Sequence, residues 1–249
     1  LEPVDALFAS ELAGEVLLSS LIEAIDEAAA DSRMTSIVMD LEDLAGPSTS
    51  QSMEIIQAIE RFSASGKPIV AVGDYFSQSH YLLAAQADEI ILHPEGGISL
   101  MGFGVYRTYL KQFLDNIRVK FHVFRAGENK SAVEPYLRDD MSPQERIGAA
   151  RWLNSLWDDY TAQVEKGRGK SEGDVTAFVN DFPARLEANG GDLAQVFLQE
   201  GYVDALLSGD EVEARVREIV DAVDDDGDVA LVGLRRYLID TRQPRDETL

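Results

Sequence analysis

The stretch Gly66-Lys67-Pro68-Ile69-Val70-Ala71-Val72-Gly73 marks the change from a helix to a buried strand. Glycine and proline end helices, and the run 69–72 contains no polar residue, as in a strand that is covered on both faces. The preceding residues 53–65 carry apolar side chains at helical spacing and predict an amphipathic helix. A helix followed directly by an apolar strand is typical of α/β proteins with a parallel sheet.

Helices and strands alternate on both sides of this stretch. Upstream, Ser20 and Glu23 have the spacing of a capping box at a helix start, and residues 36–41 predict the next strand. The elements expected downstream are a helix at 79–87, a strand at 89–92, a helix at 106–116 and a strand at 119–125. The sequence therefore predicts an α/β fold with a parallel sheet covered by helices.

The chain becomes mainly helical beyond Lys130. Ser142-Pro143-Gln144-Glu145 has the N-cap serine, the first-turn proline and the glutamate of a helix start. An apolar stripe follows at helical spacing, which we interpret as a packing or subunit surface: Ile147, Ala150, Leu153, Trp157, Tyr160 and Val164. Residues 167–174 predict a polar loop, whereas the acidic residues 221–228 and the polar residues 241–249 predict surface segments or a linker.

Composition excludes several classes of function. The 249 residues include 45 acidic and 22 basic side chains, and the net charge of -23 opposes a role in gripping nucleic acid or an anionic membrane surface. No apolar run approaches the roughly 20 residues of a membrane helix, and the start at Leu1 suggests a chain trimmed at its front. Cysteine is absent, which excludes disulfides, thiolate zinc sites and a cysteine nucleophile.

Two ligand-binding motifs fail on spacing. Gly169-Lys170-Ser171 resembles the end of a phosphate-binding loop, but the first glycine of that motif would fall at Val164. A calcium loop beginning at Asp224 would need glycine at the place of Val229 and glutamate at the place of Arg235. We therefore expect neither a nucleotide nor a calcium site.

The histidines also give no metal site, because no two of them have the i,i+4 spacing of ligands on one helix: His80, His93 and His122. No metal and no cofactor is expected. A triad of Ser77, His80 and Asp74 is conceivable, since Ser77 and His80 are three residues apart on a helix. No flanking sequence supports a nucleophile turn, so we do not favour this triad.

Residues 127–135 contain the main candidate for chemistry. Lys130 follows a predicted strand and precedes a helix start, where the positive end of the helix dipole lowers the pKa of an ammonium group. A lysine general base needs a depressed pKa, because lysine is otherwise protonated at neutral pH. The residues by themselves nevertheless favour a solvated surface lysine.

The run from Lys130 to Pro143 closely resembles the lysine segment in the amino-terminal half of the long, duplicated form of signal peptide peptidase A, or protease IV, of peptidase family S49. Similar residues occur at 36–41, 66–73, 123–125, 190–192 and 201–205. The resemblance implies a ClpP/crotonase-like fold, with repeated β-β-α units, a parallel sheet and a helical arm. It also implies that Lys130 is the general base of a Ser/Lys dyad.

The resemblance departs from an active site at the nucleophile. Short relatives place their serine on the helix after the second core strand, where this chain has Gln78 between Ser77 and Ser79. One helical step rotates a side chain by about 100°, so we interpret the two serines as N-cap or surface hydroxyls. The glycine-rich oxyanion turn is replaced by residues 44–48, in which Pro47 has no N–H to donate. The serine and the oxyanion hole are therefore expected from a carboxy-terminal half.

The resemblance implies three regions. Residues 1–140 would form the core that carries the catalytic lysine, residues 141–222 a helical arm with a return to the core, and residues 223–249 an acidic stretch and linker toward a carboxy-terminal catalytic domain. The expected function is that of the amino-terminal domain of a serine endopeptidase that degrades cleaved signal peptides, inactive when alone. The expected partners are peptide substrates, the carboxy-terminal catalytic domain and further copies of the chain, without nucleic acid. The expected location is extracytoplasmic, at the periplasmic face of the inner membrane, with membrane contact only through a segment absent here.

Two other functions stay open. The helical arm at 142–164 could mediate assembly in a non-catalytic oligomerisation domain, with Lys130 incidental. The chain could also be an acyl-CoA enzyme of the crotonase type, because one fold hosts both chemistries. No paired active-site glutamates with a CoA-binding pattern are evident in the sequence.

Overall fold

The computed structural model describes residues 16–42, 44–124, 131–220 and 230–242. The strands are β1 (Ile37–Asp40), β2 (Ile69–Phe76), β3 (Glu89–Ile98) and β4 (Ala205–Leu206). The α-helices are α2 (Leu18–Ala30), α3 (Thr49–Ser63), α4 (Gln78–Ala84), α5 (Lys111–Asn116), α6 (Glu134–Leu137), α7 (Pro143–Gly167), α8 (Asp174–Ala188), α9 (Leu193–Gln199), α10 (Asp210–Val220) and α11 (Leu234–Arg242), with a 3₁₀ turn η1 (Ser131–Val133) before α6.

The chain divides into two compact units, which are described separately. The sheet unit comprises residues 1–100 and 163–249, and the arm unit comprises residues 101–162. All four described strands belong to the sheet unit, whereas α5, α6 and most of α7 belong to the arm unit.

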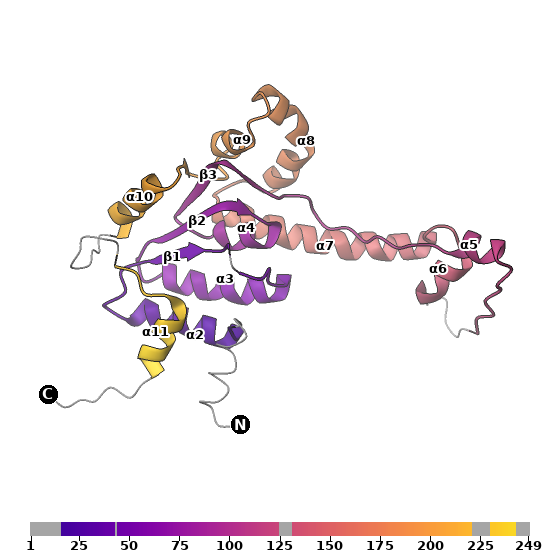
Figure 1. The fold of residues 1–249 in the computed structure, drawn as a ribbon, viewed down its shortest axis with the longest axis horizontal. Helices are drawn as coiled ribbons and strands as arrows, with labels where there is room; N and C mark the ends of the chain where they lie inside the picture. Colours follow the sequence, from indigo (N-terminus) through magenta and orange to yellow (C-terminus); the bar gives the residue numbers. More distant parts are fainter. Residues whose placement is uncertain (1–15, 43, 125–130, 221–229, 243–249) are drawn as a thin grey trace. The chain divides into compact units, whose positions relative to one another are not determined.

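The sheet has the order β1-β2-β3-β4, and every pair in it is parallel. Ile37 of β1 lies opposite Ile69 of β2, and Val70 of β2 lies opposite Glu89 of β3. The register of β2 against β3 shifts between Gly73 and Tyr75. Beyond this irregularity the two strands pair again, with Tyr75 opposite Gly97 and Phe76 opposite Ile98. The predicted α/β fold with a parallel sheet is confirmed (Figure 1).

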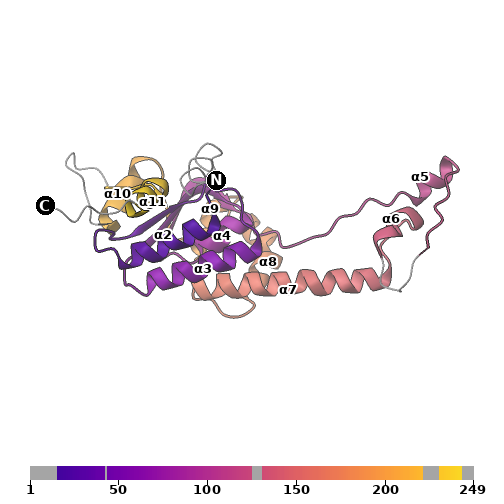
Figure 2. The same cartoon turned by 90° about the horizontal axis from the view of Figure 1, so that it is seen from below.

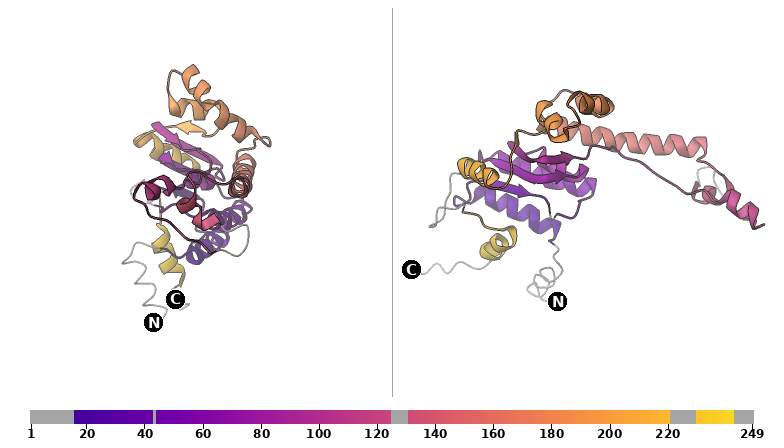
Figure 3. Two further views of the ribbon diagram at one scale, coloured as in Figure 1. Left: turned by 90° about the vertical axis from the view of Figure 1, so that its right-hand side faces the viewer. Right: turned by 45° about the horizontal axis from the view of Figure 1, so that its top comes forward.

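Helices cover both faces of this sheet, as a parallel sheet requires. Val70 and Ile91 point toward α10, where they form a cluster with Val216 and Val220. In the left view of Figure 3 the sheet lies between α10 on one side and α2 and α3 on the other. The face of α3 that is buried carries Ser52, Ile55, Ile56, Ala58, Ile59 and Phe62.

Two aspartates fix the starts of the central strands. Asp88 accepts a hydrogen bond from the backbone N–H of Ile69 at 2.9 Å, and Asp204 accepts one from Ile90 at 2.8 Å. Asp204 also binds the guanidinium of Arg168 at 2.7 Å. Hydrogen bonds to charged groups are the stronger ones, so these carboxylates help to define where β2 and β3 begin.

Among the described residues, the first helix begins differently from the prediction. α2 starts at Leu18, with Leu17 at the N-cap and no side-chain cap, so the predicted capping box at Ser20 is wrong. Ser20 is 8% exposed and lies inside the helix, on its buried face. The capping box of the following helix was not predicted: Ser48 and Gln51 form it at the start of α3.

Residues between the sheet and α7 contain less regular structure than expected. The predicted strand 119–125 is wrong over residues 119–124, which form no strand and pair with no other. Phe124 is 99% exposed, and a strand needs a neighbour to hydrogen-bond. The predicted helix 106–116 is reduced to α5, because it begins only at Lys111. β2 and β3, in contrast, extend to Phe76 and Ile98, beyond their predicted ends.

Within the arm unit, the segment before α5 starts near α7 and draws away from it toward α5 (Figure 2). Phe103 packs edge-on against Trp157 and Tyr160, with ring centroids 6.5 and 6.2 Å apart. The predicted helix start at Ser142 is confirmed, since its hydroxyl accepts a hydrogen bond from the N–H of Glu145 at 3.2 Å. The apolar stripe of α7 is buried at Tyr160 but 63% exposed at Ile147.

The predicted surface segments lie partly outside the described residues. Residues 221–229 and 243–249 are not described by the structure. Thr241 and Arg242, which were predicted to belong to a polar tail, form the end of α11. The expected division of the chain at residues 140 and 222 stays a prediction.

Candidate functional site

The turn after β1 and the start of α4 lie against each other at the carboxyl ends of the strands. The imidazole Nε2 of His80 is 2.8 Å from the carbonyl oxygen of Leu44, which requires the ring to donate from Nε2. Gly46 lies so close to Ser79 that a Cβ at position 46 would be 2.9 Å from the serine hydroxyl. The structure thus joins the two segments that the sequence assigned to the oxyanion turn and the nucleophile.

Gln78 is the first residue of α4 and is partly buried. An amide side chain has no hydroxyl or thiol to deprotonate, so Gln78 cannot form an acyl-enzyme. The residue before it, Ser77, is the N-cap, and its hydroxyl accepts a hydrogen bond from the N–H of His80 at 3.2 Å. The interpretation of Ser77 as an N-cap is confirmed.

The triad of Ser77, His80 and Asp74 has no support in this geometry. The contact between Ser77 and His80 joins the hydroxyl to the backbone N–H and not to the ring. The ring is instead directed to Leu44. Asp74 lies on β2 and is exposed. A triad needs the base within hydrogen-bond reach of the nucleophile through its ring nitrogen.

The turn at residues 44–48 is poorly suited to stabilise an oxyanion. Pro47 has no N–H, and the N–H of Ser48 donates to the side chain of Gln51 at 2.9 Å. The N–H of Gln51 in turn reaches the Ser48 hydroxyl at 3.4 Å. The amide of Ser48 is therefore engaged in the cap of α3, where it cannot also face a developing negative charge.

Two surface hollows adjoin the sheet unit. One, of about 230 Å³, lies at the carboxyl ends of the strands and is lined by Asp40, Glu42, Val72, Gly73, Asp74, Ile91, His93, Leu207, Ser208, Gly209 and Val212. Ligands of open α/β sheets bind at this edge. In this hollow His93 accepts a hydrogen bond at Nδ1 from the N–H of Glu95 at 3.1 Å. Among the residues that the structure describes, no cluster of histidine and acidic side chains fits a metal ion.

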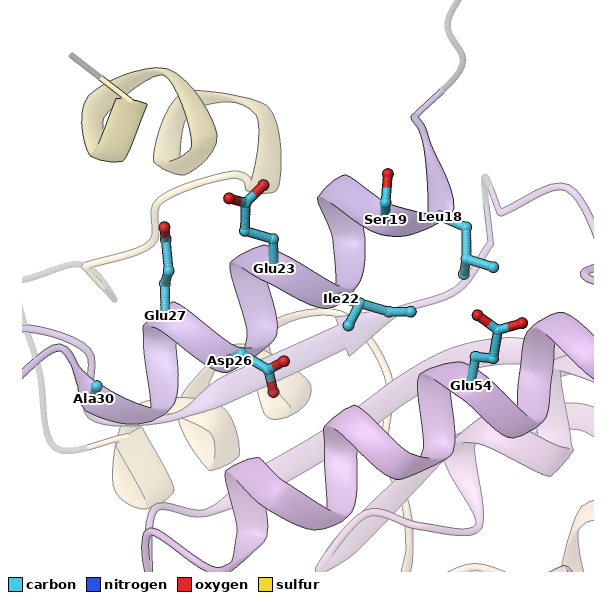
Figure 4. A pocket seen from close by; sticks show the side chains of 8 residues that line it. All are labelled: Leu18, Ser19, Ile22, Glu23, Asp26, Glu27, Ala30 and Glu54. Atoms are coloured by element: carbon cyan, nitrogen blue, oxygen red, sulfur yellow. The ribbon is translucent and has the colours of Figure 1, made fainter.

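The other hollow follows α2 (Figure 4). Its lining consists of Leu18, Ser19, Ile22, Glu23, Asp26, Glu27 and Ala30 from α2, with Glu54 from α3. Four of these eight residues are acidic, and none is a lysine or a histidine that could act as a base for Ser19. This lining gives no support for hydrolytic chemistry.

Lys130, the predicted catalytic residue, lies outside the described residues. The chain after it forms η1 and then α6, so the prediction that a helix opens near the lysine segment holds for the residues that follow. Both elements are short, with three and four residues, and the field of a helix dipole grows with its aligned peptide units. A large dipole effect on Lys130 is therefore not expected from them.

The segment after Lys130 is held by Glu134, which sequence reasoning did not single out. Glu134 is only 7% exposed, and its carboxylate accepts a hydrogen bond from the N–H of Ser142 at 3.1 Å. Hydrogen bonds from Ser142 hold the pKa of Glu134 below its usual value, assisted by the charges of Arg138 and Arg107 and opposed by burial. What distinguishes Glu134 is its burial, and burial of a single glutamate cannot be read from the sequence.

The rejected phosphate-loop motif has a structural role. Lys170 donates a hydrogen bond to the carbonyl of Glu200 at 2.7 Å and lies 4.3 Å from the ring centroid of Tyr202. Burial lowers the pKa of Lys170, and the nearby charge of Arg168 lowers it further. These two contacts tie the loop before α8 to the turn before β4. The ammonium of Lys170 is thus engaged with protein groups.

None of the helices in the described part of the chain is both long enough and apolar enough to cross a bilayer.

Comparison with known proteins identifies the family. Residues 61–222 match peptidase family S49. The chain is 40% identical over 196 residues to Protease 4 of Salmonella typhi, covering 79% of this chain and 32% of that protein. It is 32% identical over 239 residues to Protease 4 of Haemophilus influenzae, covering 94% and 38%. The chain thus spans about a third of the length of these relatives.

Comparison with solved structures matches the chain to an enoyl-CoA hydratase/isomerase family protein from Silicibacter pomeroyi. It has 14% identity and a TM-score of 0.26, covering 70% of this chain and 87% of that one. An enoyl-CoA hydratase from Mycobacterium smegmatis has 15% identity and a TM-score of 0.25, covering 82% and 85%. Scores at this level support no argument about function. The match to the family profile, in contrast, covers more than half of the chain, and the resemblance found in the sequence is confirmed at this level: the chain belongs to peptidase family S49.

Proposed function

We propose that this chain is the amino-terminal domain of a membrane-associated serine peptidase, in which Lys130 is the general base for a serine supplied by another domain. One observation supports the proposal most directly: this S49 chain keeps the lysine segment but has a glutamine where a serine nucleophile is expected. Gln78 stands at the start of α4, and the turn opposite it offers Pro47 and the engaged amide of Ser48. A lysine base without its own serine needs a second domain.

The proposed chemistry follows the Ser/Lys pattern. The neutral Nζ of Lys130 takes the proton of the serine hydroxyl while the serine oxygen attacks the peptide carbonyl. The resulting ammonium gives this proton to the departing amine as the scissile C–N bond breaks. The same lysine then activates a water molecule, which cleaves the acyl-enzyme and regenerates the serine.

The proposed substrates are signal peptides already cleaved from secreted proteins, bound in a groove between the two domains. The proposed assembly is a homo-oligomer on the extracytoplasmic, periplasmic side of the inner membrane, with a membrane segment outside this chain. The relatives named Protease 4 are about three times as long as the aligned part of this chain, which is compatible with a second catalytic domain in them.

The test uses the full-length protein and compares Lys130→Ala with Lys120→Ala, which removes an exposed lysine of the arm unit. We expect Lys130→Ala to abolish cleavage of a fluorogenic signal-peptide substrate while circular dichroism and the melting temperature stay unchanged. Lys120→Ala should cleave normally. The isolated chain should not react with a fluorophosphonate probe, because the probe needs an activated serine. Labelling of the isolated chain, or normal turnover by Lys130→Ala, would refute the proposal.

A second candidate, a non-catalytic assembly domain, is favoured by the exposed apolar side chains on α7. Ile147 is 63% exposed and Trp152 is 56% exposed. The two residues are five positions apart and therefore lie about 140° apart around the helix, so they offer apolar contacts on two sides of α7 and do not form one patch. If Lys130→Ala retained normal turnover and Trp152→Ser changed the molar mass in light scattering, the assembly function would replace the catalytic one.

A further inference from the structure

Side chains on the outward face of α2 form two parallel rows along a hollow of about 910 Å³. Each row has i,i+4 spacing, with Leu18, Ile22, Asp26 and Ala30 in one and Ser19, Glu23 and Glu27 in the other. Rows at this spacing are the ridges between which a second helix packs. The 13 residues of α2 span about 20 Å, so the hollow has room for roughly three to four turns of another helix.

The neighbouring helix α3 adds one more side chain to this hollow. In Figure 4, Ile22 and Asp26 extend from α2 toward α3, and Glu54 of α3 points toward α2. Glu23 and Glu27 extend from the other side of α2 in the same view. The hollow therefore has an apolar part, to which Ile22 contributes, and carboxylates on both of its sides.

The described lining of the hollow has a net negative charge. Four of its eight residues are acidic, and Arg61 pairs with one of them, Asp26, at 2.8 Å. Four carboxylates less one guanidinium leave a charge of −3. In addition, Glu27 Oε2 is buried and has no hydrogen-bond partner among the described residues, although buried acceptors normally have a donor. Cationic hydrogen-bond donors are the groups that such a lining attracts.

The chain itself places a helix of positive charge beside α2. α11 carries three arginines and one aspartate, and it buries Tyr237 and Leu238, which are 6% and 7% exposed. The Tyr237 hydroxyl lies 3.4 Å from the carboxylate of Asp31, at the carboxyl end of α2. Burial raises the pKa of Tyr237, and the charges of Asp31 and Glu27 raise it further, so Glu27 lies within electrostatic reach of α11. A basic helix with an apolar face is thus a kind of neighbour that α2 already has.

We propose that the hollow along α2 is a docking surface for an amphipathic helix of a partner protein, whose apolar ridge is flanked by lysine or arginine. Leu18 and Ile22 contact the apolar ridge, as in other complexes that hold a helix in a groove. The carboxylates of Glu23, Glu27 and Glu54 contact the basic side chains. The net charge of -23 attracts such a partner at longer range. This docking surface is independent of the proposed peptidase chemistry.

The experiment measures binding of a fluorescein-labelled synthetic peptide to the full-length protein by fluorescence anisotropy. The peptide is an amphipathic helix with leucines on one face and lysines beside them, and in a second peptide glutamates replace the lysines. The protein variants are Glu54→Lys and Ile22→Ser. Their matched controls are Glu172→Lys, at an exposed glutamate before α8, and Ile147→Ser, at an exposed isoleucine of α7. Circular dichroism and light scattering of each variant precede the binding measurement.

We expect the lysine peptide to bind the parent protein and the glutamate peptide not to bind. Glu54→Lys should raise the Kd about fivefold, because it replaces an attractive charge by a repulsive one. Ile22→Ser should raise the Kd about tenfold, because it removes apolar contact area. Both control variants should bind as the parent does. Added NaCl should weaken binding and reduce the effect of Glu54→Lys, since salt screens exposed charges.

Three results would overturn the proposal. Equal weakening by Glu54→Lys and Glu172→Lys would show attraction to the acidic surface as a whole. A parent protein that does not bind the lysine peptide would show that the hollow is covered or does not accept such a helix. A change of molar mass in Glu54→Lys without peptide would identify the face as a contact between copies of the chain. If Ile22→Ser fails to fold, the exposed position of Glu54 keeps the test decisive.

Discussion

The Nε2 of His80 lies 2.8 Å from the carbonyl oxygen of Leu44, two residues that are 36 positions apart in the chain. This contact fastens the first turn of α4 to the turn after β1. The turn in question contains Pro47, and the helix begins with Gln78, so the joined segments carry neither a nucleophile nor a full set of oxyanion donors. The structure therefore holds these two segments together without placing a serine at position 78 or an N–H at position 47.

The geometry around Gln78 predicts that a single substitution to serine does not create a reactive nucleophile. Gln78→Ser should leave the isolated chain unreactive toward a fluorophosphonate, because Pro47 lacks an N–H and the Ser48 amide is held by Gln51. Labelling is measured by in-gel fluorescence, with the full-length parent protein as the positive control. A Gln78→Ser chain that is labelled faster than the unsubstituted chain would contradict the structural account.

The close approach of Gly46 to Ser79 predicts a coupled effect on stability. A Cβ at position 46 would lie 2.9 Å from the Ser79 hydroxyl, so Gly46→Ala should lower the free energy of unfolding by about 1–2 kcal/mol. Adding Ser79→Ala removes the obstacle, and the double-mutant cycle should show a coupling of at least about 0.5 kcal/mol. Urea denaturation of the chain provides the measurement.

The control for that cycle is Gly148→Ala. Gly148 lies in α7, and apart from its own turns of helix no described atom is within 4 Å of the Cβ that alanine would add. Alanine favours the helix there by up to about 1 kcal/mol. Equal destabilisation by Gly46→Ala with and without the Ser79 hydroxyl would show that the contact is not the cause.

The ion pair between Arg168 and Asp204 should contribute more than an exposed one. The Arg168 side chain is 8% exposed, and Asp204 also accepts the N–H of Ile90 at the start of β3. We expect Asp204→Ala to lower the free energy of unfolding by about 2–3 kcal/mol. The substitution removes the carboxylate partner of a buried guanidinium, which keeps its longer bonds to the carbonyl of Gly201 at 3.4 Å, and it removes the side-chain acceptor of the Ile90 N–H. Lys166→Ala, which breaks an exposed pair with Glu60, should cost less than about 1 kcal/mol. Similar losses for both variants in urea denaturation would contradict this ranking.

The lowered pKa of Asp31 predicts that the free energy of unfolding depends on pH. Hydrogen bonds from Arg33 hold the pKa of Asp31 far below its usual value, and the Tyr237 hydroxyl of α11 lies 3.4 Å from the same carboxylate. A carboxylate with a depressed pKa in the folded state stabilises the fold above its unfolded pKa of about 3.9. This contribution disappears as the pH falls below that value toward the folded pKa.

The measurement compares the urea midpoints of the parent chain and Asp31→Asn between pH 2 and pH 8. The parent should have the higher midpoint above about pH 5, and the difference should shrink steadily at lower pH. Asp115→Asn serves as the control, because Asp115 pairs with Lys111 on an exposed face. A difference between parent and Asp31→Asn that is constant down to pH 2 would exclude Asp31 as its source.

Local patterns in the sequence were sufficient for several elements. Apolar spacing predicted α3 and β2, and Ser142-Pro143 predicted the start of α7. Apolar spacing and helix caps are patterns of residues within one or two turns of each other, so the sequence displays them directly. The same reasoning overestimated residues 119–124, since apolar residues form a strand only when a partner strand is available. It also placed a capping box at Ser20, a residue that the packing of α2 buries.

The sequence by itself determined the α/β class, the family and the absence of a nucleophile at Gln78, because each of these is written in residue identities and short spacings. The tertiary structure decided which distant groups meet. Leu44 reaches His80 over 36 positions, and Ile90 reaches Asp204 over 114. Such contacts arise when strands pair and helices pack, and no local spacing encodes them. The burial of Glu134 was decided in the same way, because the start of α7 returns to the lysine segment and supplies the amide that a buried carboxylate requires.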